Sequence, residues 1–498
     1  MTKSEASEDV IETSTESSLS DIPDIHIDDD YLLSFDSKSI LKPINWARKK
    51  KLYYTMLYGL ITFAAQLNST TTSAEFPQKM KEEFGIGREV SLLSTTLYIL
   101  GIAFGPMVFA PLSEVYGRKI GVMVPFFISS VFTFATAISY NVPAIMICRF
   151  FSGFFSGAPI VSAGGVLADI WVPSERGAAF ALYACFVSNG AAFGPTISSL
   201  LINSSTKIST WRIPLYFSGL VDLALLVVAL STIKETYEPV LLQRYAKDYR
   251  IRTNNWAIHV KHDMWKLNTE EIISVHLFRP FAMLMTPIIL VIALFASYVY
   301  GLFYISITSF SEAFYLTRGW EGTIATLPNI ALFLGVISGC VGNMLWANEY
   351  GKKVQLNGGL AIPEERFPIM MMLGWLMPAG IFVFGWTQYD NIHWIVPCIG
   401  IMMIGCGFIT IFQGCLNYLV DAFTKYAASA IAANTFLRSV FAASFPLFAK
   451  QLFDNLGVHW GSSLIGFIAL GMIPIPFVFY AYGKKIRSHN PYSQKISE

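Results

Sequence analysis

The sequence predicts an all-α membrane protein in which twelve transmembrane helices form two related six-helix bundles. Of its 498 residues, 54% are hydrophobic and only 14% are charged, whereas soluble domains carry about 25% charged residues. The apolar residues are gathered in segments of about 20 residues, which is the length that a membrane-spanning helix needs. A basic turn that follows the second segment also has a counterpart in the second half of the chain.

The apolar segments divide equally between the two halves of the chain. We expect the first six spans near residues 53–74, 90–111, 120–139, 143–168, 177–202 and 211–232. We expect the other six near residues 280–305, 322–345, 367–387, 393–418, 427–449 and 461–482.

The segments outside the spans are polar. The first 45 residues are rich in Ser, Thr and acidic residues, and such a segment cannot bury enough apolar surface to offset the entropy lost on ordering. We therefore predict that it is disordered. The expected organisation is a cytoplasmic tail (1–45), an N-terminal bundle (46–232), a cytoplasmic linker (233–277), a C-terminal bundle (278–483) and a second cytoplasmic tail (484–498).

Lys and Arg residues favour one side of the predicted membrane. The loops on the side of Arg118, Arg176 and the linker are much richer in basic residues than the loops on the other side. Cytoplasmic loops carry an excess of Lys and Arg. The sequence therefore predicts that the linker and both ends of the chain are cytoplasmic, and an even number of spans agrees with this.

The two halves correspond at several positions. The turn Gly117-Arg118-Lys119 has a counterpart in Glu349–Lys353, which we also expect to be a turn between two spans. Asp169 ends the fourth span as Asp421 ends the tenth. Internal repeats of this kind are typical of secondary transporters built from two related bundles.

Two stretches resemble the major facilitator superfamily. Residues 111–119, between the second and third spans, are similar to the family's signature loop, although Pro111 replaces its first glycine. The fourth span carries Arg149 followed by Gly153 and Gly157, which resembles the family's fourth-span pattern. The resemblance implies the fold of that superfamily, with alternating access to a central site.

Further stretches resemble the fungal twelve-span drug:proton antiporter branch, which includes multidrug and polyamine transporters. Residues 235–242 and 438–448 are similar to stretches of this branch, and Gly190, Gly194 and Pro195 are similar to the superfamily's fifth-span antiporter motif. The resemblance implies a monomer in the plasma membrane that exchanges drug-like molecules or polyamine-type cations for protons. An internal membrane, of the vacuole or the endoplasmic reticulum, is the alternative location.

Three charged residues lie inside predicted spans, where charge is costly and usually functional. The family resemblance implies that Arg149 acts near proton exchange or substrate. Asp222, the one acid well inside a span, is a candidate for proton exchange or for binding a cation. Arg438 in the eleventh span is a third candidate. The structural alternative for each is a hydrogen bond to a neighbouring helix.

Neutral polar residues extend the candidate site. Gln66 and Asn68 are two residues apart, so they point to opposite faces of a helix, and we expect only one of them to face the centre. Asn189, Gln413 and Asn417 lie in other spans. Their side chains either contact substrate or join helices. Aromatic residues such as Tyr298, Tyr300 and Tyr304 are candidates for cation–π contact with an amine.

A second group of charges lies at the cytoplasmic ends of the spans. Glu114, Arg118, Asp169 and Arg176 resemble the family's charge relay. We expect their ion pairs to hold an inner gate closed and to break as the halves move. The alternative is that they only set the topology and cap helices.

The sequence lacks the features of several other classes. A Gly-rich ATP-binding loop ending in Lys-Ser/Thr is absent, and the six cysteines have neither zinc spacing nor an evident disulfide pairing. We expect no catalytic residues, metal, cofactor or nucleic-acid partner. The partners that we expect are a small-molecule substrate, protons and the lipid bilayer. Two other functions remain open, namely proton-coupled uptake of a polyamine, vitamin or sugar, and a transport-inactive sensor.

Overall fold

The computed structural model describes residues 25–28, 30–73, 75–204, 208–261, 278–358, 360–423 and 426–488. Residues 1–24 of the first tail, residues 262–277 of the linker and residues 489–498 of the second tail lie outside this description. The predictions made for those three segments therefore stay predictions.

The first half of the chain forms long helices joined by short elements. The long helices are α2 (Arg48–Thr70), α4 (Arg88–Val115), α5 (Arg118–Ile138), α6 (Val142–Ile170), α7 (Pro173–Ile202) and α8 (Arg212–Thr232). The shorter elements are β1 (Ile25–Ile27), β2 (Leu33–Phe35), η1 (Pro43–Asn45), α3 (Phe76–Phe84), η2 (Ile208–Trp211) and α9 (Glu238–Thr253).

The second half repeats this design with more interruptions. Its helices are α11 (Arg279–Leu284), α12 (Pro287–Arg318), α13 (Gly322–Thr326), α14 (Asn329–Leu356), η5 (Pro363–Arg366), α15 (Phe367–Leu373), α16 (Leu376–Trp386), α17 (Ile395–Ala422), α18 (Ala427–Met472) and α19 (Pro474–Ser488). Inside α18 the backbone leaves helical geometry at Gly457, whose φ of 71° suits only glycine, so this label covers two helices.

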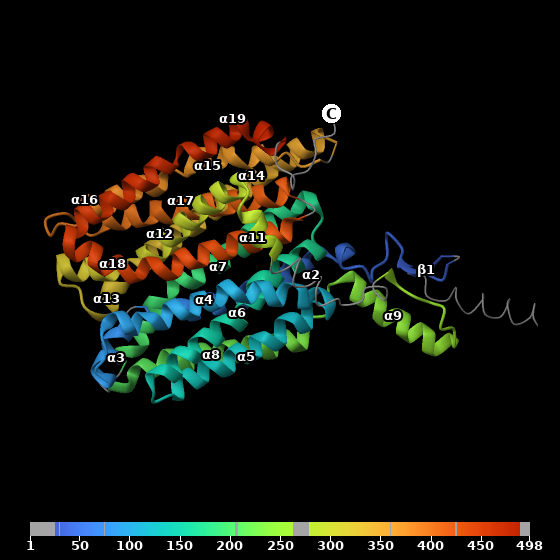
Figure 1. Ribbon diagram of the computed structural model, residues 1–498, viewed down its shortest axis with the longest axis horizontal. Coiled ribbons are helices and arrows are strands. Elements are labelled where there is room, and N and C mark those ends of the chain that lie inside the picture. Colours follow the sequence, from blue (N-terminus) through green and yellow to red (C-terminus); the bar gives the residue numbers. More distant parts are fainter. Residues whose placement is uncertain are drawn as a thin grey trace, which may run out of the picture.

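The long helices lie in two groups, one for each half of the chain (Figure 1). Helices α2 to α8 form one group, and α12 to α19 form the other. We call the end that holds Arg118, Arg366 and α9 the basic end, and the end that holds α3 and α13 the far end. Figure 1 shows β1, α9 and the C-terminus together at the basic end.

Eleven of the described helices are long and apolar enough to cross a membrane. They correspond to the second to twelfth predicted spans, which confirms an all-α membrane fold. The first predicted span is α2, which is 23 residues long and falls outside that set. Gln66, Asn68 and several tyrosines lower its hydropathy, yet 15 of its residues are buried because it packs within the first bundle.

The seventh span begins and ends later than the sequence predicts. The expected range was 280–305, whereas α12 runs from Pro287 to Arg318. Proline is favoured at the first helical position, and α11 is a separate short helix before it. The polar residues Ser309 and Glu312 do not end α12, which continues to Gly319, a left-handed residue with a φ of 62°.

The second basic turn is not a turn, and this prediction was wrong. Residues 349–353 lie inside α14, which continues to Leu356. The first basic turn does occur, because Gly117 adopts a φ of 95° between α4 and α5. Gly351 has no such geometry, and Lys353 instead pairs with Glu365 at 2.6 Å. The chain therefore reverses after α14 rather than at the basic residues.

Part of the predicted disordered tail is folded. Strands β1 and β2 pair antiparallel, with Ile25 opposite Phe35. Leu32 also forms a bridge to His259, beyond α9. Leu33 is buried with Ala246 and Ile258 in a small apolar cluster, so the prediction of disorder does not hold for the two strands, residues 25–27 and 33–35. Their alternating apolar residues bury one face against α9.

Candidate transport site

Arg149 is buried completely in the first bundle, where polar groups of α2 and α4 hold it. Its guanidinium donates to the Asn68 side-chain oxygen (3.0 Å), the Asn68 backbone oxygen (2.9 Å), Thr72 (3.1 Å) and the backbone oxygen of Ser94 (3.2 Å). It also lies 4.4 Å from the centre of the Tyr98 ring. Every one of these groups is uncharged. The geometry is that of the structural alternative, in which the arginine joins three helices.

Hydroxyl groups continue this network into α5. The Asn68 amide donates to Thr133 (2.8 Å), whose hydroxyl lies 2.8 Å from that of Ser152. Ser129 and Tyr98 both contact the hydroxyl of Ser156. Because each buried hydroxyl has a partner, the network orients Asn68 and thereby fixes the guanidinium.

Gln66 and Asn68 point to opposite sides of α2, as their spacing predicts. Asn68 faces the interior of its own bundle, as described above. Gln66 faces the other bundle, because its side-chain oxygen accepts a hydrogen bond from Tyr304 of α12 at 3.2 Å. The same tyrosine hydroxyl lies 3.1 Å from Ser69. Gln66 is therefore the member of the pair that reaches the junction of the two halves.

Asp222 of α8 is buried, with 1% of its surface exposed. Neither of its carboxylate oxygens has a hydrogen-bond partner in the described part of the chain. Helix α8 packs against α5 and α2 of its own bundle. Leaving an ionised carboxylate in such a place would be very costly. We therefore expect this group to hold a proton in the conformation described.

The other predicted polar residues lie at different depths. Gln413 of α17 reaches across to α7, where its amide donates to the backbone oxygen of Ala181 at 3.3 Å. Asn189 of α7 contacts Cys185 one turn away on its own helix, and its side-chain oxygen has no described partner. Asn417 is half-buried on α17. Only Gln413 among these three joins the halves.

Arg438 of α18 lies among aromatic rings of its own bundle. Its guanidinium is 4.7 Å from the centre of the Tyr300 ring and 5.0 Å from that of Phe412. The residue is 5% exposed, and its Nε atom has no hydrogen-bond partner among the described residues. The predicted aromatic site for an amine thus already faces a cation of the protein.

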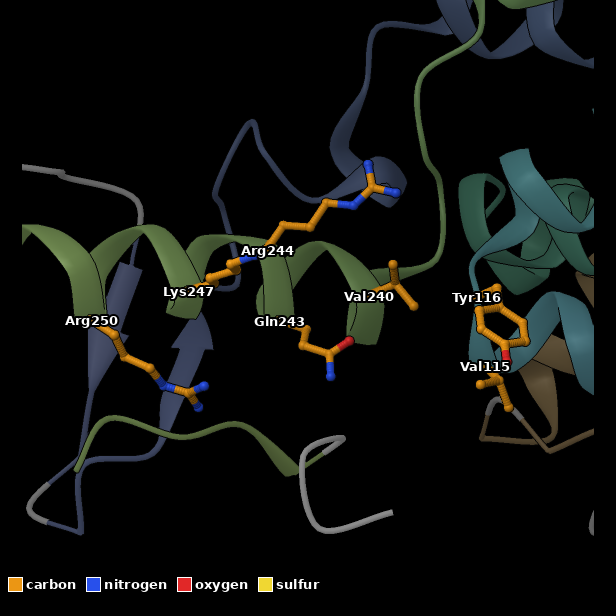
Figure 2. Close-up of a pocket in the computed structure, with 7 residues that line it drawn as sticks. All are labelled: Val115, Tyr116, Val240, Gln243, Arg244, Lys247 and Arg250. Atoms are coloured by element: carbon orange, nitrogen blue, oxygen red, sulfur yellow. The ribbon is translucent and has the colours of Figure 1, made fainter. Parts of the chain in front are cut away.

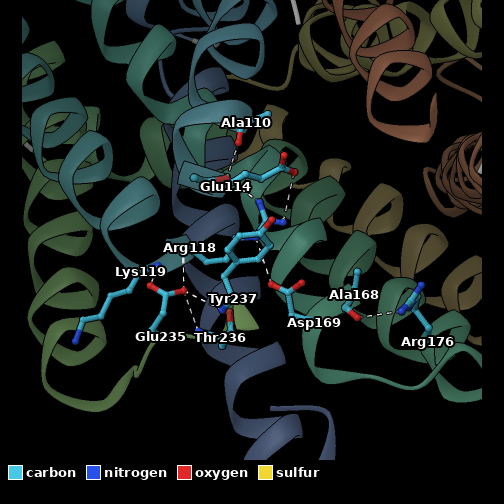
Figure 3. A network of polar contacts seen from close by, with 11 residues as sticks. Ala110, Glu114, Arg118, Lys119, Ala168, Asp169, Arg176, Glu235, Thr236 and Tyr237 are labelled. Atoms are coloured by element: carbon cyan, nitrogen blue, oxygen red, sulfur yellow. Dashed lines mark hydrogen bonds and ion pairs between the residues drawn. The ribbon is translucent and has the colours of Figure 1, made fainter. Parts of the chain in front are cut away.

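At the basic end, the predicted charge relay lies within the first bundle (Figure 3). The Arg118 Nε lies 3.3 Å from Asp169 at the end of α6, and its Nη2 lies 3.6 Å from Glu114 of α4. Arg176 does not join them, because it donates to the backbone oxygen of Ala168 at 2.9 Å. Three of the four predicted residues therefore meet, and the fourth caps α6.

Glu235 was not predicted as a site residue, yet it organises this corner. Its carboxylate accepts hydrogen bonds from the backbone N–H groups of Arg118 (2.8 Å), Lys119 (3.1 Å), Thr236 (2.9 Å) and Tyr237 (3.0 Å). The first two are unpaired donors at the start of α5, where negative charge is favoured. Burial raises the pKa of the Tyr237 phenol, whose ring lies 4.8 Å from the Arg118 guanidinium.

The second bundle has a corresponding group of ion pairs. Arg366, just before α15, lies 2.8 Å from Asp421 at the end of α17. Asp421 also accepts a hydrogen bond from Tyr350 at 2.7 Å. Arg487, near the end of α19, forms two bonds of 2.8 Å with Glu364. The pair Arg118–Asp169 is thus repeated, which explains why the sequence places Asp169 and Asp421 at equivalent positions.

Polar contacts between the two bundles gather at the middle and the far end. Arg88 of α4 forms a bidentate ion pair with Glu312 of α12, at 2.7 and 2.9 Å. Thr196 of α7 donates to the backbone oxygen of Thr326 at 3.1 Å. At the basic end, by contrast, no ion pair between described residues joins one bundle to the other.

The predicted antiporter motif forms a contact between α7 and α2. A side chain at Gly190 would collide with the backbone oxygen of Phe63, and one at Gly194 with Thr70. Pro195 lies inside α7 directly after them. The two glycines therefore allow close approach of helices within the first bundle.

A cavity of about 370 Å³ lies outside the bundles, between α9 and the basic end of α4 (Figure 2). Tyr116 and Val240 provide apolar walls, and Arg244 and Lys247 provide positive charge. None of the predicted transport residues lines it.

Comparison with known proteins agrees with this architecture. Residues 58–446 match the family model of the Major Facilitator Superfamily. The chain is 38% identical over 91% of its length to "Efflux pump bik6" of Gibberella fujikuroi, of which the match covers 93%. It is 37% identical over 93% of its length to "Major facilitator superfamily multidrug transporter FLU1" of Candida albicans, of which the match covers 76%.

A solved structure of the proton:xylose symporter XylE has the same fold. The two align with a TM-score of 0.59 and 13% sequence identity, over 88% of this chain and 96% of that one. The repeated bundles, the paired ion contacts at their basic ends and the match over most of the sequence lead to one conclusion. The chain belongs to the major facilitator superfamily.

Proposed function

We propose that this protein is a secondary active transporter that exports small drug-like molecules by alternating access, in exchange for protons. The observation that carries the proposal is the arrangement of contacts at the two ends. Ion pairs brace each bundle separately at the basic end, whereas the bundles touch through polar groups at the middle and the far end. The similarity to an efflux pump and to a multidrug transporter supports the substrate class.

This arrangement suits two rigid bundles that rock against each other. The pairs Arg118–Asp169 and Arg366–Asp421 connect helices of one bundle, so they need not break when the bundles move. The pair Arg88–Glu312 connects both bundles and has to break when the far end opens. We infer that the far end is closed in this conformation, and that the inner gate is formed without the predicted relay.

Asp222 is the proton-exchanging group in this proposal. It is the one carboxylate among the described residues that is buried inside a span without any polar partner. A neutral acid here becomes an ionised one only when water or a cation reaches it. Movement of α8 relative to α5 would supply such access. Proton release would then be linked to the conformation of the first bundle.

The remaining predicted residues have other roles in this scheme. Gln66 and Gln413 form hydrogen bonds across the junction of the bundles. These hydrogen bonds would break when the bundles separate. Arg149 positions α2 through Asn68. Asn189 and Asn417 stay candidates for substrate contact. We also propose a monomer in the plasma membrane with the basic end in the cytoplasm.

Flux in reconstituted vesicles tests the coupling. The purified full-length protein is placed in vesicles with a trapped pH-sensitive dye, and cationic, neutral and anionic drug-like compounds are added in turn. Antiport predicts that proton movement opposite to the compound accompanies its flux. Uptake by symport, the competing function, predicts proton movement in the same direction.

Two matched variants test the role of Asp222. Asp222→Asn removes the buried acid, and Asp390→Asn removes an exposed one between α16 and α17. We expect substrate-linked proton movement to be lost in the first variant and kept in the second. Proton movement of wild-type size in Asp222→Asn would show that another group carries the proton.

A further inference from the structure

The Arg438 guanidinium is a nearly buried positive charge without a counter-ion. The residue is 5% exposed and lies in the eleventh span. No described residue forms a hydrogen bond or ion pair with its guanidinium, whose Nε atom is enclosed without a partner. Buried charges are normally paired. Arg149, by comparison, has four hydrogen bonds. Arg438 therefore lacks a partner that a negatively charged ligand would supply.

A second unpaired polar group lies next to this arginine. Asn434 is one helical turn before Arg438 on α18, so the two side chains lie on the same face. Asn434 is 0% exposed, and both its side-chain nitrogen and its side-chain oxygen lack partners among the described residues. An amide N–H and a guanidinium are both donors. Together they suit the oxygens of a carboxylate.

The surroundings of Arg438 are aromatic. The Tyr300 and Phe412 rings face the guanidinium. Behind them, the Phe303 and Phe408 rings are stacked with centroids 4.0 Å apart, and Tyr304 lies 5.3 Å from Tyr300. These rings, from α12 and α17, form an aromatic wall. A flat ring system packs well against such a wall.

The aromatic wall reaches the junction of the two bundles. Tyr304 contacts Gln66 and Ser69 of α2. Gln413, the residue after Phe412, contacts the backbone of α7. A molecule bound at Arg438, beside this wall, would thus lie near elements of both bundles, as an alternating-access substrate must.

We propose that Arg438 and Asn434, with the rings of Tyr300 and Phe412, bind the carboxylate of an aromatic organic acid. This inference rests on the proposed function and names its substrate class, an organic anion in place of the polyamine-type cations that the resemblance implies. Arginine matches a carboxylate with two parallel hydrogen bonds. An amine would be repelled by the positive charge of the Arg438 guanidinium.

A competing explanation is that an acidic side chain of the protein pairs with Arg438 in another conformation. In that case the arginine controls the movement of the bundles, and its loss affects every substrate equally. In our proposal its loss affects only anions. Probes that differ in charge alone separate these two explanations.

Binding is measured as thermal stabilisation of the full-length protein in detergent, since a ligand that binds the folded state stabilises it by RT ln(1 + [L]/Kd). The probes are 1-naphthoate, 1-naphthalenemethanol and 1-naphthylmethylammonium, which share one ring system. We expect wild type to bind naphthoate most tightly. Arg438→Gln should weaken naphthoate binding at least tenfold, or about 1.4 kcal/mol, and leave the binding of the alcohol unchanged. Arg438→Lys keeps the charge but loses the bidentate geometry. Its affinity for naphthoate should lie between those of wild type and Arg438→Gln.

Arg487→Gln is the matched control, because Arg487 is equally buried but pairs with Glu364 at the basic end. It should lower the melting temperature without changing naphthoate affinity.

The proposal is overturned by preferential binding of the ammonium, by the absence of naphthoate binding, or by equal weakening of all probes in Arg438→Gln. If cationic compounds are exchanged for protons in vesicles while naphthoate does not bind, only this inference fails. If naphthoate binds through Arg438 but no compound is transported, the proposed function fails instead.

Discussion

Removal of the Glu235 carboxylate should destabilise the first bundle strongly. This side chain is 3% exposed and accepts four backbone hydrogen bonds, two from the start of α5 and two from the segment that follows α8. Glu235→Ala would leave four N–H groups without this acceptor. Each unsatisfied buried donor costs about 1–3 kcal/mol. Because water can enter at the basic end, we take the lower bound, which gives about 4 kcal/mol.

Glu235→Gln should have a smaller effect. The amide oxygen can accept two hydrogen bonds, so it satisfies part of the same set, but the negative charge at the start of α5 is lost. We expect a loss of about 2 kcal/mol. Glu238→Ala is the control, since Glu238 forms a partly exposed ion pair with Lys42 at 3.2 Å. Such pairs contribute about 0–1 kcal/mol.

Thermal unfolding with a thiol-reactive fluorophore measures these differences. All six cysteines are free and are buried or half-buried in the structure, so they react as the bundles open. The melting temperature should decrease from wild type and Glu238→Ala to Glu235→Gln and then to Glu235→Ala. Equal melting temperatures for wild type and Glu235→Ala would refute the reasoning.

Three further predictions concern other contacts. Gly117→Ala should cost about 1–3 kcal/mol in the same assay, because its φ of 95° strains any other residue; an unchanged melting temperature would contradict this. Asn68→Ala should destabilise by a similar amount, since Arg149 loses an acceptor, whereas Asn68→Asp, which keeps an oxygen, should be milder. Arg88→Gln should favour opening of the far end up to about fivefold, for a loss of about 1 kcal/mol. Spin labels on α3 and α13 should then show longer distances, and the charge exchange Arg88→Glu with Glu312→Arg should restore the wild-type distribution.

The membrane fold was predictable because hydropathy is a local property. Runs of apolar residues identify spans wherever the chain supplies about 20 of them. The same criterion located α2 near residues 53–74 although its spanning segment carries polar residues, which are satisfied by other helices. It misplaces α12, whose limits depend on Pro287 and Gly319 rather than on hydropathy. The presence of a spanning helix can therefore be predicted from composition, whereas the residues at which it begins and ends depend on individual side chains.

The helix faces of some candidate residues were predictable from the sequence, whereas the partners of these residues were less so. Spacing alone separates the faces of Gln66 and Asn68, and the structure confirms this. By contrast, the partner of Arg176 is a backbone oxygen, and no sequence pattern predicts that contact. Glu235 was not predicted as a site residue because its partners are backbone N–H groups, which carry no sequence signal. A search for an acid near the end of the sixth span would have found it.

The confinement of basic-end ion pairs to single bundles has a consequence for biogenesis. Each group of helices completes its own bracing as soon as its last helix is made, Glu235 for the first and Arg487 for the second. The nascent first half can therefore mature before the ribosome reaches the second. A polypeptide severed between residues 261 and 278 should still assemble from two separately synthesised fragments, because none of the bracing contacts between described residues needs the peptide bonds that were cut.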